Sequence, residues 1–207
     1  MYYATIKKTD VANGPGIRVS LFVSGCTHGC KGCFNSEAWN FQYGKEYTQE
    51  TEQEILAALA PSYIKGLSVL GGEPMEPQNR GTVLELLEKV HSHYPEKSIW
   101  CYTGYDYEKD ILRWEAQERA GCKSRENVDN LYCGGQRDVD SFCCNGLDAA
   151  EHPGTVSRLL NLIDVLVDGE FVEEKKNLRL AFRGSENQRL IDVKKSRQLG
   201  EVVCLDL

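Results

Sequence analysis

The chain has 207 residues and a formal net charge of −7, from 24 Lys and Arg against 31 Asp and Glu. This length supports one good hydrophobic core, which predicts a single domain over residues 1–207. No basic run could follow a phosphate backbone, so nucleic acid is excluded as an expected partner.

The first predicted elements are a strand and a helix. After the turn signal NGPG, the β-branched run IRVSLFVS (17–24) predicts a strand that ends where a cysteine-rich loop begins. Residues 48–60 predict a helix, because Thr51 and Glu54 match a capping box and Pro61 marks the end of an amphipathic pattern.

The middle of the chain continues this alternation. GLSVL (66–70) predicts a short buried strand, which is followed by the turn GGEP. The segment 79–94 has apolar residues at helical spacing, and KSIWCY (97–102) predicts the next strand. Alternating strands and helices predict an α/β fold with a mostly parallel sheet.

The last third interrupts the rhythm. Residues 116–154 are polar and rich in Gly, Asn and Asp, and we interpret them as an insertion within the domain. IDVLVDGEF then restores a strand at 163–167. The segment LRLAFRGSENQR (178–189) predicts a final element, followed by a charged linker and a short apolar end.

Compartment and thiol chemistry follow from the same residues. The first ten residues lack an apolar signal core, and the longest apolar stretch is too short to span a bilayer, so we expect a cytoplasmic protein without a membrane partner. Nine cysteines without an export signal indicate reduced thiols or metal ligands rather than disulfides. Cys101 and Cys204 lie in strand-like runs and are predicted to be buried.

Three cysteines, Cys26, Cys30 and Cys33, lie within eight positions of one glycine-containing loop. A structural zinc would need a fourth sulfur or nitrogen, whereas a 4Fe-4S cubane held by three thiolates keeps one iron free for another ligand. Only the last two cysteines have the CxxC spacing of small zinc sites. The spacing favours iron–sulfur and leaves zinc open; His28 is interpreted as a loop side chain, not a ligand.

The motif CTHGCKGC resembles the CxxxCxxC cluster motif of the radical S-adenosylmethionine enzymes. Further segments, NGPG, GGEP, WCYTGY, LVDGEF and FRGSENQR, occur between residues 13 and 189 in the order typical of one branch of them. That branch is the family of activating proteins of anaerobic ribonucleoside-triphosphate reductase. The cluster motif and GGEP would identify only the superfamily, whereas NGPG, LVDG and RGSxNQ together favour the narrower family.

The resemblance implies a fold and a first set of site residues. The fold would be a partial, open (β/α) barrel of the radical-SAM type, with the site at the carboxyl ends of the strands. Three irons of a 4Fe-4S cluster would be bound by the three cysteines, and the amino and carboxylate groups of S-adenosylmethionine would chelate the fourth. These ligands are Cys26, Cys30 and Cys33.

Contacts to S-adenosylmethionine are carried over in the same way. The methionine end would be lined by Gly71, Gly72, Glu73 and Pro74, for which an ordinary strand-to-helix turn is the alternative. Gly32 and Phe34 would offer a backbone contact and an apolar face to adenine, although this chain has Gly32 where many superfamily members have an aromatic residue. Phe34 has a second interpretation, as a core residue.

The implied activity is reductive cleavage of S-adenosylmethionine and removal of a hydrogen from a glycine Cα in the large subunit of the reductase. The electron would come from a one-electron reductant such as flavodoxin. No histidine has a role in this step, and all four are predicted to be surface or loop residues. Asp168, Arg183 and Asn187 are interpreted as lining the docking side, or else as a salt-linked surface.

Three alternatives remain open at this point. They are an activase of another glycyl-radical enzyme, a small-molecule radical S-adenosylmethionine enzyme of the deazapurine-synthesis type, and a zinc-stapled binding module. The insertion also has four thiols, enough for a second metal, but no CxxC pair occurs among them. They are Cys122, Cys133, Cys143 and Cys144.

Overall fold

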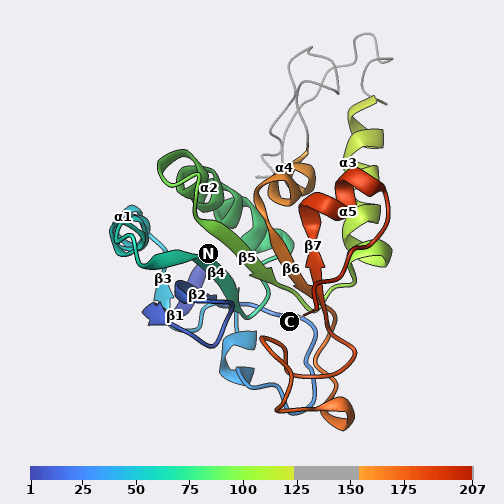
Figure 1. Cartoon of the computed structure of the whole chain (residues 1–207), viewed down its shortest axis with the longest axis horizontal. Helices are drawn as coiled ribbons and strands as arrows, with labels where there is room; N and C mark the ends of the chain where they lie inside the picture. The colour runs from blue at the N-terminus through green and yellow to red at the C-terminus, as the bar shows by residue number, and fades with distance from the viewer. Residues whose placement is uncertain (124–153, 207) are drawn as a thin grey trace, which may run out of the picture.

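The computed structural model describes residues 1–123 and 154–206, and these form one seven-stranded sheet with helices packed on it (Figure 1). The strand order is β3-β1-β2-β4-β5-β6-β7. Strands β2, β4, β5 and β6 are parallel, while β1, β3 and β7 pair antiparallel at the two sides. The strands are β1 (Tyr2–Asp10), β2 (Ile17–Val23), β3 (Lys45–Glu46), β4 (Ile64–Gly71), β5 (Ser98–Tyr102), β6 (Val165–Asp168) and β7 (Arg189–Asp192).

The predicted α/β class and parallel centre are confirmed. The sheet is open, because β3 and β7 are its edges and do not pair with each other. Antiparallel pairs form where the connection between two strands is short or irregular. The NGPG turn connects β1 to β2, and the segment between β6 and β7 contains no α-helix that could form a parallel crossover. The four parallel strands place their carboxyl ends along one edge of the sheet.

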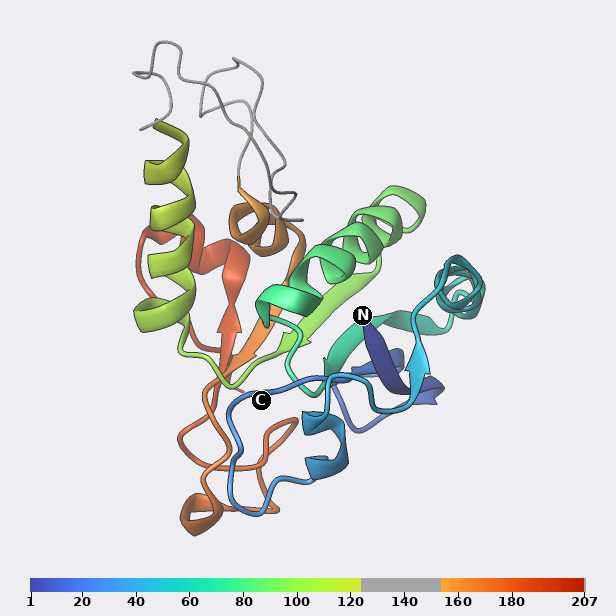
Figure 2. The same ribbon diagram turned by 180° about the vertical axis from the view of Figure 1, so that it is seen from behind.

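Five α-helices occur in the described part of the chain, and α2, α4 and α3 lie together over β5 and β6 (Figure 2). No described helix is long and apolar enough to cross a membrane. Short 3-10 and π turns supplement them. The helical elements are α1 (Gln49–Leu59), α2 (Pro77–His93), α3 (Leu112–Lys123), α4 (Thr155–Leu162), α5 (Val193–Leu199), η1 (Ser36–Trp39), η2 (Tyr107–Ile111) and η3 (Glu173–Lys175).

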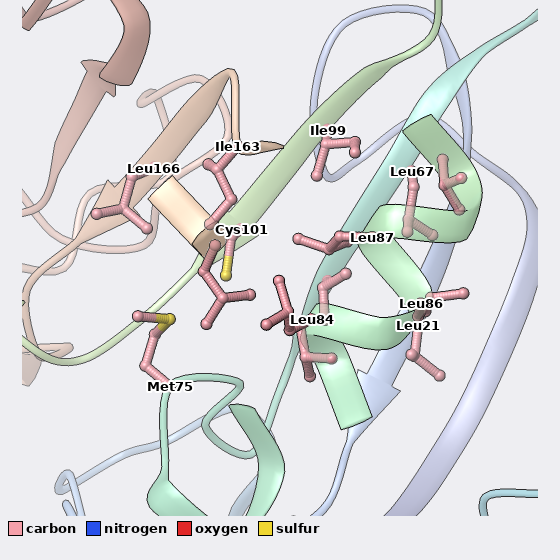
Figure 3. Packing of buried hydrophobic residues seen from close by; sticks show 14 of the residues in the cluster. Leu21, Leu67, Met75, Leu84, Leu86, Leu87, Ile99, Cys101, Ile163 and Leu166 are labelled. Carbon is pink, nitrogen blue, oxygen red and sulfur yellow. The ribbon is translucent and has the colours of Figure 1, made fainter. Parts of the chain in front are cut away.

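The main core lies between the helices and one face of the sheet. Strand residues such as Leu21, Leu67 and Ile99 point toward Leu84 and Leu87 of α2 (Figure 3). Alternate strand residues point to the opposite face, where a second, smaller cluster forms. That cluster contains Trp100, Val165, Val167 and Leu190, with Phe182 and Leu205 packed against it.

Several sequence-based boundaries change. The predicted helix 48–60 is α1, but its capping box is formed by Thr48 and Thr51, not by Thr51 and Glu54. The predicted element at 178–189 is wrong, since this segment is irregular apart from the bridge that Ser185 makes and the first residue of β7. The charged linker in fact contains the end of β7 and helix α5, whose N-cap is Asp192.

The insertion prediction concerns a part of the chain that is only partly described. Helix α3 continues through residues 116–123, and α4 begins at Thr155. Residues 124–153, with Cys133, Cys143 and Cys144, lie outside the described residues, and so does the side chain of Cys122. The insertion and its metal-binding alternative therefore stay predictions.

A buried arginine joins the central strands on the second face. The Arg18 side chain is fully buried, and its Nε donates to Ser68 Oγ at 2.8 Å. Its Nη1 donates to Ser98 Oγ at 2.9 Å, and its Nη2 donates to the carbonyls of Leu67 and Ser98, each at 2.8 Å. The guanidinium also lies 5.5 Å from the Trp100 ring centroid. Burial lowers the pKa of Arg18 to about 10, so the buried group still carries its charge at neutral pH.

We predict that Arg18→Met lowers the free energy of unfolding by about 3 kcal/mol, because buried carbonyl and hydroxyl groups lose their donors. Denaturant titration of the metal-free chain measures this change. The matched control is Arg113→Met, which removes an exposed arginine of α3 and should alter stability by less than about 0.5 kcal/mol. Equal stability of the two variants would contradict the assigned role of Arg18.

Candidate functional site

Loops that follow β2, β4, β5 and β6 meet at the carboxyl edge of the sheet and enclose an open cavity of about 640 Å³. All three cysteines of the sequence motif line this cavity, and so do the two glycines of the GGEP turn. Phe22, Leu70 and Tyr102 of the parallel strands add to its wall. The structure therefore brings the two main sequence motifs together.

The cysteine loop and the GGEP turn touch through their backbones. Gly72 N donates to the carbonyl of Val23 at 2.7 Å, and Glu73 N donates to the carbonyl of Gly25 at 2.8 Å. A Cβ on Gly72 would stand 2.6 Å from the Gly25 carbonyl oxygen, closer than real side chains come. Glycine at this position is thus required by the packing of the two loops.

Glu73 lies in the cavity wall, but its carboxylate is bound by the protein itself. The residue is 1% exposed; Oε1 accepts from Met75 N at 2.8 Å, and Oε2 accepts from Gly104 N at 2.7 Å. His28 Nε2 lies 3.1 Å from the same Oε2. Both carboxylate oxygens therefore hold the loops together, in addition to any contact with a ligand.

His28 lies in the loop after β2, as predicted, but its side chain is largely covered rather than exposed. Its side chain is 9% exposed and lies between Glu73 and Glu170, with Nδ1 2.9 Å from Glu170 Oε1. Burial alone would lower the pKa of His28, but the hydrogen bonds and charges of the two glutamates raise it to about 9. The raised pKa favours the imidazolium form of His28, which lies between two carboxylates. These partners lie 45 and 142 positions away in the chain, so no local pattern could have revealed them.

Two further polar residues, absent from the sequence-based site, position the cysteine loop. Asn79 at the start of α2 is 2% exposed and donates through Nδ2 to the carbonyls of Ser24 and Glu73, each at 2.9 Å. Glu76 Oε1 accepts from Thr27 N at 2.9 Å and from Thr27 Oγ1 at 2.5 Å. The only feature of the sequence that could have indicated these two residues is their proximity to the GGEP motif.

Two of the three thiols, Cys26 and Cys30, have raised pKa values that favour their neutral form. Burial raises the pKa of Cys26 to about 11, and the charges of Glu73 and Glu76 add to the effect. Burial also raises the pKa of Cys30. Asn35 N donates to Cys33 Sγ at 3.4 Å. Binding of a cation to these sulfurs must therefore release protons.

The donor set fits a cluster better than one metal ion. Among the residues that the structure describes, no group of three or more His, Cys, Asp or Glu side chains is placed so that it could hold a metal ion. Thiolates that bind separate irons of a cubane do not have to converge on one point. Three cysteines around a large cavity, with a backbone N–H directed at one sulfur, fit that arrangement.

Of the remaining predicted site residues, two line the cavity and one does not. Phe34 is 93% exposed at the mouth of the cavity, so its interpretation as a core residue is wrong. Gly32 lines the cavity in a left-handed conformation (φ 72°), where a Cβ would meet Glu173 Oε1 at 2.9 Å. Pro74 is buried and does not line the cavity.

Three other predictions have clear outcomes. Asp168 does not line a docking side, because it is 1% exposed and holds Arg189, with Oδ1 3.0 Å from Nε. Cys101 is buried as predicted. Cys204 is exposed, since its segment forms only an isolated bridge to Ile191 outside the sheet, so the prediction of burial is wrong there.

Comparison with known proteins now adds to this geometry. The family described as "4Fe-4S single cluster domain" matches residues 12–123 and 126–191. Curated relatives named anaerobic ribonucleoside-triphosphate reductase-activating protein also match. That of Vibrio cholerae is 38% identical over 91% of this chain and 96% of its own, and that of phage T4 is 35% identical over 92% and 93%. The Escherichia coli K12 relative is 33% identical over 91% of this chain and 96% of its own.

The chain belongs to the family of anaerobic ribonucleoside-triphosphate reductase-activating proteins. The resemblance seen in the sequence motifs is therefore confirmed. For this family member, the structure explains the GGEP and TGY motifs as loops that must pack closely: Gly72 against Gly25, and Gly104 against His28.

We predict that Gly104→Ala destabilises the metal-free protein by about 2 kcal/mol. The new Cβ would stand 2.6 Å from His28 Cδ2, and His28 cannot move aside without breaking its bonds to two glutamates. The matched control is Gly81→Ala within α2, where a Cβ meets nothing within 4 Å and the substitution should be neutral or stabilising. Denaturant titration of both variants checks this, and equal effects would contradict the packing argument.

Proposed function

We propose that the chain cleaves S-adenosylmethionine reductively at a 4Fe-4S cluster and so generates the glycyl radical of anaerobic ribonucleoside-triphosphate reductase. The observation that carries the proposal is the cavity at the carboxyl edge of the sheet. It is lined by Cys26, Cys30 and Cys33 together with Gly71 and Gly72 of the GGEP turn. The names of the curated relatives support the choice of partner.

The cysteine loop would hold the cluster, and this chain's residues explain how. When bound, the cluster supplies the electron that breaks the C5′–S bond of S-adenosylmethionine, so that the adenosyl fragment can take a hydrogen atom from a glycine Cα. Cys26, Cys30 and Cys33 would each lose a proton as they bind. Asn35 N already donates to Cys33 Sγ and so helps to orient this ligand.

The wall beside the cysteines would bind the substrate. Gly71 and Gly72 contribute backbone to the cavity wall, and Glu73 fixes that turn through its bonds to Met75 and Gly104. Pro74 would support the turn from behind. In addition, Tyr102 lines the cavity, and its hydroxyl has no hydrogen-bond partner among the described residues. Burial raises its pKa, so this hydroxyl is available as a donor.

The adenine end would lie near the mouth. Gly32 offers backbone there, and Phe34 offers an exposed aromatic face. The open sheet would act as an incomplete barrel, and this openness suits a target hydrogen that belongs to a polypeptide. The proposal includes the large subunit of the reductase as partner, a one-electron donor such as flavodoxin, and a cytoplasmic location.

We predict that Cys26→Ala, Cys30→Ala and Cys33→Ala each abolish cluster retention after anaerobic reconstitution, because two thiolates leave a second iron without a protein ligand. Iron and sulfide analysis and the visible absorption near ~400 nm measure retention. The control is Cys204→Ala, which removes an exposed thiol that does not line the cavity and should leave iron content unchanged. A colourless zinc-containing wild-type protein would refute the proposal.

We also predict that the chain, S-adenosylmethionine and a one-electron reductant give an organic radical only when the reductase is present. Electron paramagnetic resonance should show a doublet, because one α-hydrogen remains on the target glycine, and deuteration there should give a singlet. Replacing the target glycine by alanine should remove the signal, since Cβ hinders approach. Formation of deoxyadenosine with turnover of a purine precursor, and no radical on the reductase, would instead support the small-molecule alternative.

A further inference from the structure

The rim loop, defined here as residues 175–183 (KKNLRLAFR), has a charge opposite to that of the whole chain. Four of these nine residues are Lys or Arg and none is Asp or Glu, although the chain carries 31 acidic against 24 basic residues. The loop begins at the last residue of η3 and lies beside the cysteine loop at the same edge of the sheet (Figures 1 and 2). Lys176 and Leu178 line the mouth of the cavity.

Three of the four cations of the rim loop make no ion pair within the described residues, whereas the fourth, Arg183, donates through Nη1 to the Gln188 carbonyl at 3.3 Å. Lys175, Lys176 and Arg179 are exposed, and no ion pair joins any of them to a carboxylate in the described part of the chain. Lys31 of the neighbouring cysteine loop differs, because it pairs with Glu173 at 3.1 Å. Three exposed cations without an ion-pair partner among the described residues therefore lie next to the site, in a segment flanked by Glu173, Glu174 and Glu186.

The rim loop also exposes an apolar side chain. Leu178 is 89% exposed, and Phe34, at the same cavity mouth, is 93% exposed. Single exposed apolar residues are ordinary, but here two lie at the mouth of one cavity and one of them stands between free cations. A mixed cationic and apolar surface suits a partner that is acidic and carries apolar side chains.

The FRGSENQR motif holds this loop in place. Gln188 Oε1 accepts from Gly184 N at 2.9 Å and from Ser185 N at 3.2 Å, while Gln188 Nε2 donates to the Gly169 carbonyl at 3.0 Å. Asn187 Nδ2 donates to the Glu170 carbonyl at 2.8 Å. The base of the loop is thus fixed to the segment that follows β6.

Backbone strain at Phe182 supports the same arrangement. It is the one described non-glycine residue with a positive φ, 57°, a conformation that costs roughly 1 kcal/mol. Its ring packs edge-on against Trp100, with centroids 5.5 Å apart. The loop therefore packs the partly buried Phe182 on the second face of the sheet and leaves Leu178 outside.

We propose that the rim loop is a docking surface for the reductase, and that it binds an acidic segment with apolar side chains close to the target glycine. This inference rests on the proposed function for the identity of the partner. Opposite charges would steer the partner's segment toward the cavity mouth, and Leu178 would contact it there. A nucleic acid fits less well, because the rest of the chain is acidic.

The test reverses two loop charges that do not line the cavity, in Lys175→Glu/Arg179→Glu. Binding of the cluster-loaded protein to the purified large subunit is measured anaerobically as association rate against salt concentration. We expect association at least about tenfold slower at low salt, with the difference shrinking as salt screens the charges. Cleavage of S-adenosylmethionine by a chemical reductant without the reductase should be unchanged.

The matched control is Lys45→Glu/Arg113→Glu, which makes the same change in net charge on exposed residues of β3 and α3. It should bind like wild type, apart from the small effect of net charge. Leu178→Asp provides a second variant, expected to weaken binding with unchanged thermal stability because the side chain is exposed.

Each outcome decides between the two proposals. Wild-type binding by the charge-reversed variant, or an equal loss in the control, would overturn the docking surface. Loss of S-adenosylmethionine cleavage without the reductase would assign the loop to the substrate site instead. A change in oligomeric state of the charge-reversed variant alone would assign the loop to a contact between copies of this chain. Binding that depends on the rim loop, without any radical on the reductase, would support the surface and refute the proposed function.

Discussion

The candidate site depends on one buried carboxylate. Glu73 is 1% exposed and accepts hydrogen bonds from Met75 N and Gly104 N, while His28 lies against the same side chain. A buried charge without such partners would be strongly unfavourable, so the loops after β2, β4 and β5 have to assemble around it. Because His28 also reaches Glu170, the loop after β6 joins the same network. The wall of the cavity is thus fixed by the chain itself.

This network explains why small residues recur in the loops. Where three backbones meet around one carboxylate, side chains have to be absent at the points of closest approach, as at Gly72 and Gly104. A histidine inserted between two glutamates carries a positive charge, which offsets part of the negative charge close to Cys26. Burial and the charges of Glu73 and Glu76 nevertheless raise the pKa of Cys26 and so disfavour its thiolate. A positively charged ligand bound to the sulfurs would offset this effect.

The sequence predicts those parts of the fold that repeat locally. Strands β2, β4, β5 and β6 follow β-branched or apolar runs, and α1 and α2 follow helical spacing, so all six could be found. β1 and α5 were missed because each has many polar residues and only a few that contact the core, so no strand or helix pattern is visible in the sequence. The three cysteines and the GGEP turn could be assigned from spacing and resemblance. His28 could not, since its role comes from partners far away in the chain.

The irregular segment after β6 is a second feature that local sequence patterns could not predict. Residues 170–188 have almost no regular pairing, and their shape is set by side chains that bond to backbone, chiefly those of Gln188, Asn187 and Ser185. Such bonds have no periodic signature, which is why a regular element was wrongly predicted there. Their physical effect is to give the loop one conformation without burying its cations. The residues of the FRGSENQR motif thus hold the rim loop in place. The residues that the rim loop exposes remain free to contact a partner.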